Sequence, residues 1–104
     1  MGVTPAQVRE LVARLPGALE GAHHGHPDFR VQKKIFATLS ESEDRCAVRL
    51  THVEARALAA SHPTTVRLVS DREPIGWVSI LLDAIGPDEL ADLLEEAWKL
   101  RAPC

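Results

Sequence analysis

The stretch RCAVRL, residues 45–50, alternates between two kinds of side chain along its whole length. The apolar positions are Cys46, Val48 and Leu50, and the positions between them are Arg45, Ala47 and Arg49. Alternation with a period of two residues is typical of a β-strand whose two faces meet different surroundings. An antiparallel sheet covered on one side provides that contrast. The stretch therefore predicts a sheet with one apolar face and one open, partly basic face.

Helices are predicted on either side of this strand and near the end of the chain. One follows Thr4 and another follows Thr51, because each threonine begins a capping box with a glutamine or glutamate three residues later. Gly86 and Pro87 open the last helix, whose apolar stripe contains Leu94. Each helix has an apolar side to bury, and the apolar face of the sheet is the surface available for it.

Strand signals occupy the segments between these helices. The predicted strands cover residues 29–31, 35–39, 45–50, 66–70 and 77–82, with turns at residues 32–34, 40–44 and 71–76. Residues 18–24 are a weaker strand candidate before them. The order α-β-β-β-α-β-β-α, with that first strand poorly formed, indicates one two-layer α+β domain over residues 1–104. We expect an antiparallel sheet with the helices packed on one face, in a monomer.

Composition narrows the class of protein. Apolar residues make up 45% and charged residues 26% of the chain, which is an ordinary globular balance. No apolar run approaches the roughly 20 residues of a transmembrane helix, and the N-terminus lacks the basic and apolar segments of a signal peptide. The two cysteines form no disulfide framework and suit a reducing compartment. We therefore expect a cytoplasmic protein.

The net charge of −3 is unevenly placed along the chain. From Asp83 onward six acidic residues stand against two basic ones, Lys99 and Arg101, so this segment carries −4. The preceding residues therefore carry +1. An acidic total argues against strong, indiscriminate nucleic-acid binding, but the part of the chain before Asp83 can still present a basic surface.

Four segments of the chain resemble the MmcQ/YjbR-like family of small bacterial proteins. They are LPGALEG (15–21), HPDFRVQKKIFATL (26–39), GWVSILLD (76–83) and ELADLLEEAWKLRAP (89–103). The resemblance extends over about residues 4–103. It implies a two-layer α+β domain similar to CyaY and to secretion chaperones, in a family whose members are commonly labelled DNA-binding. The family carries no agreed catalytic residues, so the resemblance assigns none.

The chain departs from the family's pattern at the turn before Lys34. That turn often holds a glycine in the family, whereas this chain has Gln32 and Lys33. A turn that requires positive φ favours glycine over lysine. A hairpin of that kind would therefore be strained here.

Three histidines lie within the stretch GAHHGHPDFR, residues 21–30. Zinc requires three or four His, Cys or carboxylate ligands that converge on the ion. On a strand His24 and His26 share a face while His23 points away, and a glycine and a proline interrupt the strand. A third ligand would have to come from His52, His62, Asp28 or Cys46. We therefore predict a strand edge or turn, with no stoichiometric zinc in the purified protein.

Catalytic motifs are missing from the chain. Cys46 occupies an apolar strand position, where a free cysteine is usually an inert core residue. Asp83 and Glu89 are explained by a strand end and by the first turn of a helix. The chain contains no nucleophile elbow, phosphate loop or dinucleotide fingerprint. We expect neither an enzyme nor a cofactor.

The basic residues of the strands and hairpins are the remaining candidates for a binding site. Together with one tryptophan, the predicted nucleic-acid-binding residues are Arg30, Lys33, Lys34, Arg45, Arg49, Arg67 and Trp77. Arginine and lysine on an open sheet face suit phosphate oxygens, and a tryptophan can stack on a base. The same residues can equally be a solvated surface with a tryptophan at its rim.

Two functional hypotheses follow. The first is weak, non-specific DNA binding through the sheet face and the hairpin at residues 32–34. The second is a protein-interaction or chaperone-like module without catalytic activity, in which the sheet face or the acidic last helix docks a protein partner. A continuous positive surface on the open face would favour DNA, whereas a large exposed apolar surface would favour a protein.

Overall fold

The computed structural model describes residues 2–23 and 25–102 of the chain. Within them, the helices are α1 (Pro5–Ala13), α2 (His52–Ser61) and α3 (Pro87–Arg101), with a short 3₁₀ turn, η1 (Leu82–Ala84), before α3. The strands are β1 (Ala18–His23), β2 (His26–Val31), β3 (Lys34–Leu39), β4 (Arg45–Thr51), β5 (Val66–Arg72) and β6 (Ile75–Leu81). The predicted order is confirmed. The weak strand candidate is formed as β1, which pairs with β2 along its length.

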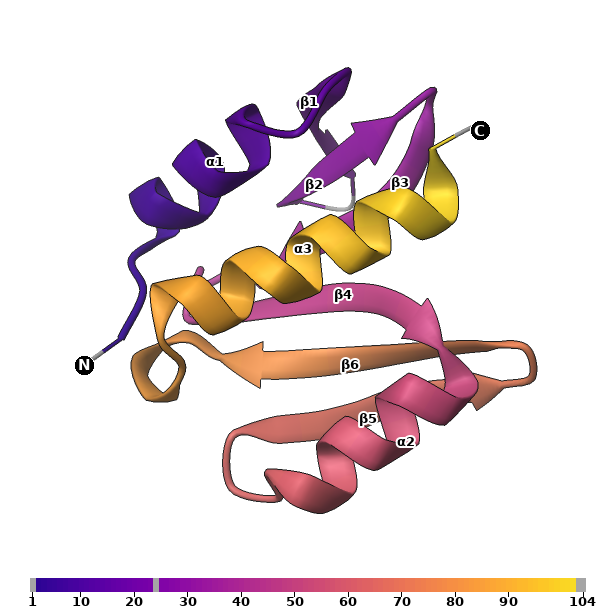
Figure 1. The fold of residues 1–104 in the computed structure, drawn as a ribbon. Coiled ribbons are helices and arrows are strands. Elements are labelled where there is room, and N and C mark those ends of the chain that lie inside the picture. Colours follow the sequence, from indigo (N-terminus) through magenta and orange to yellow (C-terminus); the bar gives the residue numbers. More distant parts are fainter. Residues whose placement is uncertain (1, 24, 103–104) are drawn as a thin grey trace.

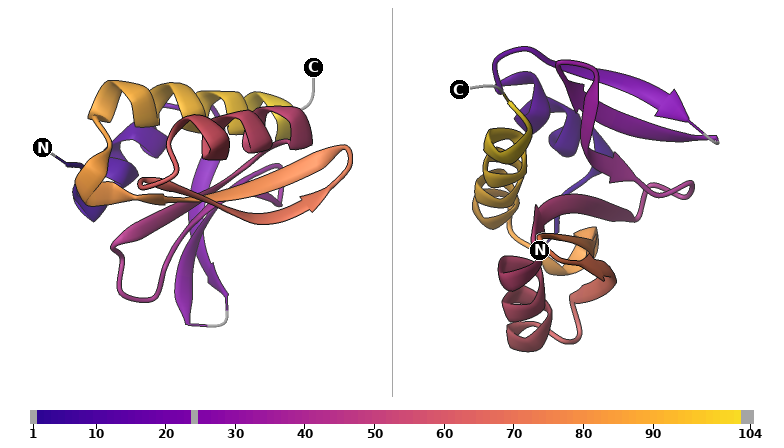
Figure 2. Two further views of the ribbon diagram at one scale, coloured as in Figure 1. Left: turned by 90° about the horizontal axis from the view of Figure 1, so that it is seen from below. Right: turned by 90° about the vertical axis from the view of Figure 1, so that its right-hand side faces the viewer.

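The described strands form one antiparallel sheet in the order β1-β2-β3-β4-β6-β5. α3 packs on β3 and β4, α2 packs mainly on β5 and β6, and α1 contacts β1 and α3. Figures 1 and 2 show the helices gathered on one side of the twisted sheet. The predicted two-layer α+β fold is therefore confirmed. We call the side of the sheet without helices the open face.

The core lies between the helices and the apolar side of the sheet. Cys46, Val48 and Leu50 are buried, as the alternation in β4 predicts, and α3 contributes Leu90 and Leu94. Full burial of one such aliphatic side chain contributes roughly 1.5–3 kcal/mol. None of the described helices is long and apolar enough to cross a membrane.

The helix ends form as the sequence predicts. Both capping boxes are present, at Thr4 for α1 and at Thr51 for α2, and a cap of this kind contributes about 1 kcal/mol. Beside the first turn of α2 lies Gly76 of β6, where a Cβ atom would be 2.5 Å from the Cβ of Ala55. Glycine at this position therefore allows α2 to lie close against the sheet.

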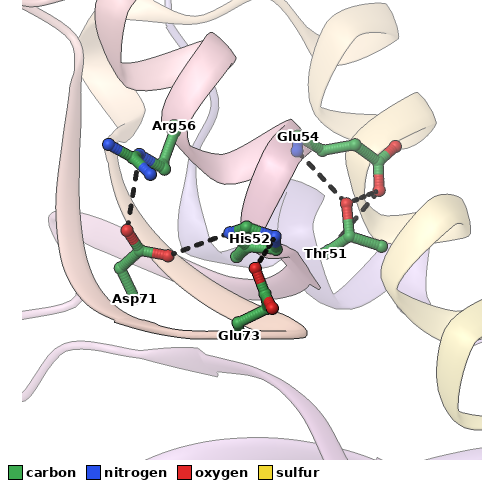
Figure 3. A network of polar contacts seen from close by, with 6 residues as sticks. All are labelled: Thr51, His52, Glu54, Arg56, Asp71 and Glu73. Atoms are coloured by element: carbon green, nitrogen blue, oxygen red, sulfur yellow. Dashed lines mark hydrogen bonds and ion pairs between the residues drawn. The ribbon is translucent and has the colours of Figure 1, made fainter.

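Polar contacts shown in Figure 3 connect the hairpin between β5 and β6 to the start of α2. The ring of His52 lies between two carboxylates, with Nδ1 3.6 Å from Oδ1 of Asp71 and Nε2 3.2 Å from Oε2 of Glu73. Nε of Arg56 is 3.4 Å from Oδ2 of Asp71. The sequence indicated a turn over residues 71–76, which is wrong, because strand pairing continues through most of this segment and leaves a tight turn.

Two β-bulges change which side chains reach the open face. Between β2 and β3 the register shifts, so that Phe36 and Ala37 are both buried while Ile35 and Thr38 on either side are partly exposed. A second shift lies between β5 and β6, at residues 68–70. An extra residue in one strand breaks the strict alternation of faces. The lining of the open face therefore differs from what alternation alone predicts.

The hairpin between β2 and β3 turns at Gln32 and Lys33, whose φ angles are 53° and 67°. Two consecutive residues of positive φ form the turn whose twist suits a β-hairpin, and asparagine followed by glycine usually occupies it. Side chains with a Cβ atom adopt this region only at a cost in free energy. The strained turn that the family pattern suggested is thus present.

Candidate nucleic-acid interface

Arg49 and Trp77 lie next to each other on the open face. They are directly paired across β4 and β6, and directly opposite residues of an antiparallel pair share one side of the sheet. Both side chains are partly buried, whereas the adjacent Val48 and Val78 are fully buried on the helix side. By the same register, the other arginines on the open face of β4 and β5 are Arg45, Arg67 and Arg72.

A groove of about 450 Å³ is formed beside Trp77 on this face. Its other lining residues are Ile35, Thr38, Ala47, Val69, Ser70 and Arg101. We call it the Trp77 groove. The two bulges supply its apolar walls, because they leave Ile35 and Val69 on the open face. Val69 is 59% exposed, so the groove offers apolar surface to a ligand as well as polar groups.

Arg101 reaches this groove from the helix layer. It is the last residue of α3, and its Nε donates a hydrogen bond of 3.0 Å to the carbonyl oxygen of Ile35. All residues of β3 and β4 are described, and the pairing between these two strands begins at Ala37 and Val48. Ile35 is therefore not paired with β4. The two strands have separated at this point, which leaves room for a side chain from α3. Arg101 therefore brings a guanidinium into the groove, next to Trp77, whose partner across the sheet is Arg49.

The two guanidinium groups lie close enough to influence each other. Burial lowers the pKa of Arg49, and the positive charge of Arg101 lowers it further. Within the described part of the chain, no carboxylate forms an ion pair with either of them. Two neighbouring cations without a carboxylate partner favour an anion between them.

The other arginines that β4 and β5 place on the open face also lack ion pairs within the described residues. Arg45 is held along the strands, because its side chain donates to Oγ of Ser79 at 2.7 Å and to the carbonyl oxygen of Ser79 at 3.1 Å. Arg67 and Arg72 are exposed. The open face therefore carries five arginines that form no ion pair among the described residues: Arg45, Arg49, Arg67, Arg72 and Arg101.

Arg30 lies on the same face but has a different role. Its guanidinium binds Asp28 with two hydrogen bonds, Nε to Oδ1 at 2.9 Å and Nη2 to Oδ2 at 3.0 Å. These bonds raise the pKa of Arg30, while the Asp28 side chain is 0% exposed. A Cβ at the facing Gly21 would lie 2.9 Å from Oδ1 of Asp28, so glycine leaves room for this pair. The charge of Arg30 is balanced inside the fold.

Lys33 and Lys34 are exposed at the end of the β2–β3 hairpin. Lys34 pairs with the buried Val31, which places its side chain on the helix side of the sheet. Of the predicted site residues, the structure thus brings Arg45, Arg49, Arg67 and Trp77 together on the open face, places Lys33 at the end of the hairpin in a pocket with Arg30, and places Lys34 on the helix side.

Sequence reasoning did not assign Arg101 to the site. A signal was present, because Arg101 follows Leu94 and Ala97 at the helical spacing of the apolar stripe of α3. The other tryptophan, Trp98, is partly buried against the core and donates from Nε1 to the carbonyl oxygen of Pro16 at 2.9 Å. It therefore belongs to the helix layer.

The histidine stretch is only partly described. His24 and the side chain of His23 lie outside the described residues. Among those described, no group of three or more His, Cys, Asp or Glu side chains is placed to hold a metal ion. Burial raises the pKa of the Cys46 thiol to about 12. This cysteine therefore stays a protonated core residue at neutral pH.

Comparison with known proteins identifies a family and a similar structure. A family model described as YjbR matches residues 13–100. The crystal structure of protein DR2400 of Deinococcus radiodurans, which has a DUF419 domain, matches with a TM-score of 0.82. The two sequences are 20% identical, and the match covers 94% of this chain and 78% of the other, so it shows a shared fold. No curated protein matches the chain.

Proposed function

The chain belongs to the YjbR family, and we propose that it binds nucleic acid weakly and without sequence preference through the open face of its sheet. The observation that carries this proposal is the set of arginines on the open face, Arg45, Arg49, Arg67 and Arg72, with Arg101 in the Trp77 groove. None of them forms an ion pair within the described residues. A cationic surface of this kind suits a polyanion, because each phosphate contact releases a condensed counterion.

The distribution of charge sets the strength of this binding. The net charge of −3 opposes a polyanion at long range. However, the acidic residues of α3, among them Glu95, belong to the helix layer on the other side of the sheet. We expect about three to five phosphate contacts, and therefore an affinity that falls steeply as salt is added.

The apolar part of the open face indicates which kind of ligand the face can bind. Strands of DNA and RNA offer bases with flat apolar surfaces next to charged phosphates. The Trp77 groove has the matching combination, since Trp77, Ile35 and Val69 lie beside Arg101. Neither a purely basic surface nor a purely apolar one is present, and this mixture favours nucleic acid over an apolar protein segment.

Charge-reversal variants test the proposal. Arg67→Glu changes an exposed side chain on the open face, so it should weaken binding to all sequences and reduce the salt slope by about one. Lys34→Glu is the matched control, because it makes the same charge change on the other side of the sheet and should have a smaller effect. Glu95→Gln, on α3, should leave binding unchanged or slightly stronger. Fluorescence anisotropy with labelled duplex and single strands at low salt measures all of them.

The absence of binding would reject the proposal. Non-specific DNA-binding proteins have dissociation constants of about 10⁻⁴–10⁻⁶ M at physiological salt. If neither a duplex nor a single strand binds below about 100 μM even at low salt, the nucleic-acid function is wrong. An equal loss for Lys34→Glu and Arg67→Glu would also contradict it, because the open face would then have no special role.

A second surface supports the alternative, a protein-interaction module. A groove of about 330 Å³ is lined by Leu50, Glu54, Ala57, Leu58, Ser61, His62 and Leu93. Its walls come from α2 and from Leu93 of α3, its base includes Leu50 of β4, and the acidic Glu54 of α2 lies in its lining. Such a groove fits a helical segment with apolar anchors and basic flanks. We would propose protein interaction as the function if the anisotropy measurements showed no binding of nucleic acid.

A further inference from the structure

We propose that the Trp77 groove holds one unpaired nucleotide, with the base stacked on Trp77 and a phosphate between Arg49 and Arg101. The inference rests on the proposed function and specifies its ligand. A base can enter the groove only when it is not stacked inside a duplex. The protein should therefore bind single strands in preference to duplexes.

The groove has the size and lining that a nucleotide requires. Its volume of about 450 Å³ lies within the roughly 300–1,000 Å³ typical of small-ligand pockets. Ile35 and Val69 provide apolar walls beside the indole of Trp77, and Thr38 and Ser70 provide hydroxyl groups. Hydroxyl groups both donate and accept hydrogen bonds, so they can meet the edge of any base. This lining is consistent with binding that does not depend on sequence.

Arg101 in the groove and Arg49 beside Trp77 are the residues that point to an anion. Arg49 lies directly beside Trp77 in the sheet, and Arg101 is held at the groove by its hydrogen bond to Ile35. The lowered pKa of Arg49 reflects burial and the nearby charge of Arg101. A phosphate bound between the two guanidinium groups would remove this repulsion, and arginine binds phosphate through paired N–H groups.

The same contacts explain why both halves of the nucleotide matter. The base alone would leave two neighbouring cations without a counter-charge, and phosphate alone would leave Trp77 and Val69 exposed to water. One nucleotide satisfies both, because its base and its phosphate are joined by a sugar. A nucleic-acid strand adds further phosphates, for which Arg45, Arg67 and Arg72 lie on the same face.

Three probes separate the contributions of base and phosphate. They are an oligothymidylate of about eight nucleotides, within the ~4–16 nucleotides that a small domain covers, an abasic strand of the same length, and a blunt duplex of that length. We expect the oligothymidylate to bind most tightly. Trp77→Ala should weaken it by about five- to 150-fold, the range for loss of one stacking side chain. The same substitution should change the affinity for the abasic strand and for the duplex by less than about twofold.

Two further variants guard against a structural explanation. Trp77→Phe keeps an aromatic ring and should retain most of the affinity for oligothymidylate. Arg101→Gln should weaken the oligothymidylate and the abasic strand alike, because it removes a phosphate contact. Thermal unfolding of each variant checks that it is folded, and Trp77→Leu, which keeps apolar bulk without an aromatic ring, replaces Trp77→Ala if the alanine variant is not folded.

The outcomes distinguish this inference from the function on which it rests. If the duplex binds as tightly as the oligothymidylate and Trp77→Ala has no selective effect, the open face binds phosphates but the groove does not hold a base. If Trp77→Ala weakens all three probes equally, Trp77 has a structural role and the inference is wrong. If no probe binds, the inference and the proposed function both fail.

Discussion

Arg30 and Arg49 carry the same charge on the same face of the sheet, and their neighbours give them different roles. Arg30 is bound by both oxygens of the buried Asp28, whereas Arg49 lies near Arg101 without an ion pair among the described residues. The spacing of Asp28 and Arg30 by two residues on a strand was a sequence signal for their pairing. The proximity of Arg101 to Arg49 depends on how α3 packs on the sheet, and no comparable spacing in the sequence indicates it.

The turn at Gln32 and Lys33 provides a prediction at this scale. Lys33 has a φ of 67°, a conformation that costs a residue with a Cβ atom about 1–2 kcal/mol. Glycine adopts it freely but loses more conformational entropy on folding. Lys33→Gly should therefore stabilise the protein by about 0.5–1 kcal/mol, measured as the free energy of unfolding in urea.

Lys33→Ala is the control for the charge. It removes the same ammonium group but keeps the Cβ atom, so its stability should stay within about 0.5 kcal/mol of the wild type. Equal stabilisation by both variants would show that charge, and not backbone strain, is the cause. A destabilised Lys33→Gly variant would contradict the turn geometry.

At the scale of helices and strands, the sequence predicted the features that depend on neighbouring residues in the chain, namely the helix caps and the alternation of strand faces. Both capping boxes form, and the alternation in β4 separates buried from exposed side chains as expected. The bulges in β3 and β5 were not predicted, because a register shift depends on the partner strand and on packing. Ile35 and Val69, which line the Trp77 groove, owe their position to these shifts. Of the apolar lining of the groove, the pattern thus indicated Trp77 and Ala47 but not Ile35 or Val69.

Helix α3 offers the test of packing at this scale. Leu94 is 1% exposed and lies on the apolar stripe that the sequence predicted. Leu94→Ala should leave a cavity between α3 and the sheet and lower the free energy of unfolding by about 2–5 kcal/mol. A loss below about 0.5 kcal/mol in the same urea titration would mean that the register of α3 is different. Glu95→Ala, at the exposed next position, should change stability little.

In the whole molecule, the acidic side chains of α3 and the basic side chains of the open face lie on different sides of the sheet, which the net charge of −3 does not reveal. The acidic residues of the C-terminal segment lie mainly on α3, in the helix layer, and the open face carries five arginines that form no ion pair with the residues described in the structure. The sequence predicted this division in part, from the charge of −4 beyond Asp83. It assigned Arg101 to the acidic segment, although the side chain lines the groove on the other side of the sheet. Only the arrangement of α3 over the gap between β3 and β4 reveals that contact.

Nuclear magnetic resonance of the two indole N–H groups tests the central claim, that the open face is the nucleic-acid interface. Trp77 lines the groove on that face, and Trp98 donates its N–H to Pro16 in the helix layer. Addition of oligothymidylate at low salt should shift the Trp77 indole signal progressively and leave the Trp98 signal in place. A shift of Trp98 with an unchanged Trp77, or no shift of either at about millimolar oligonucleotide, ten times the weakest usual non-specific dissociation constant, would contradict it.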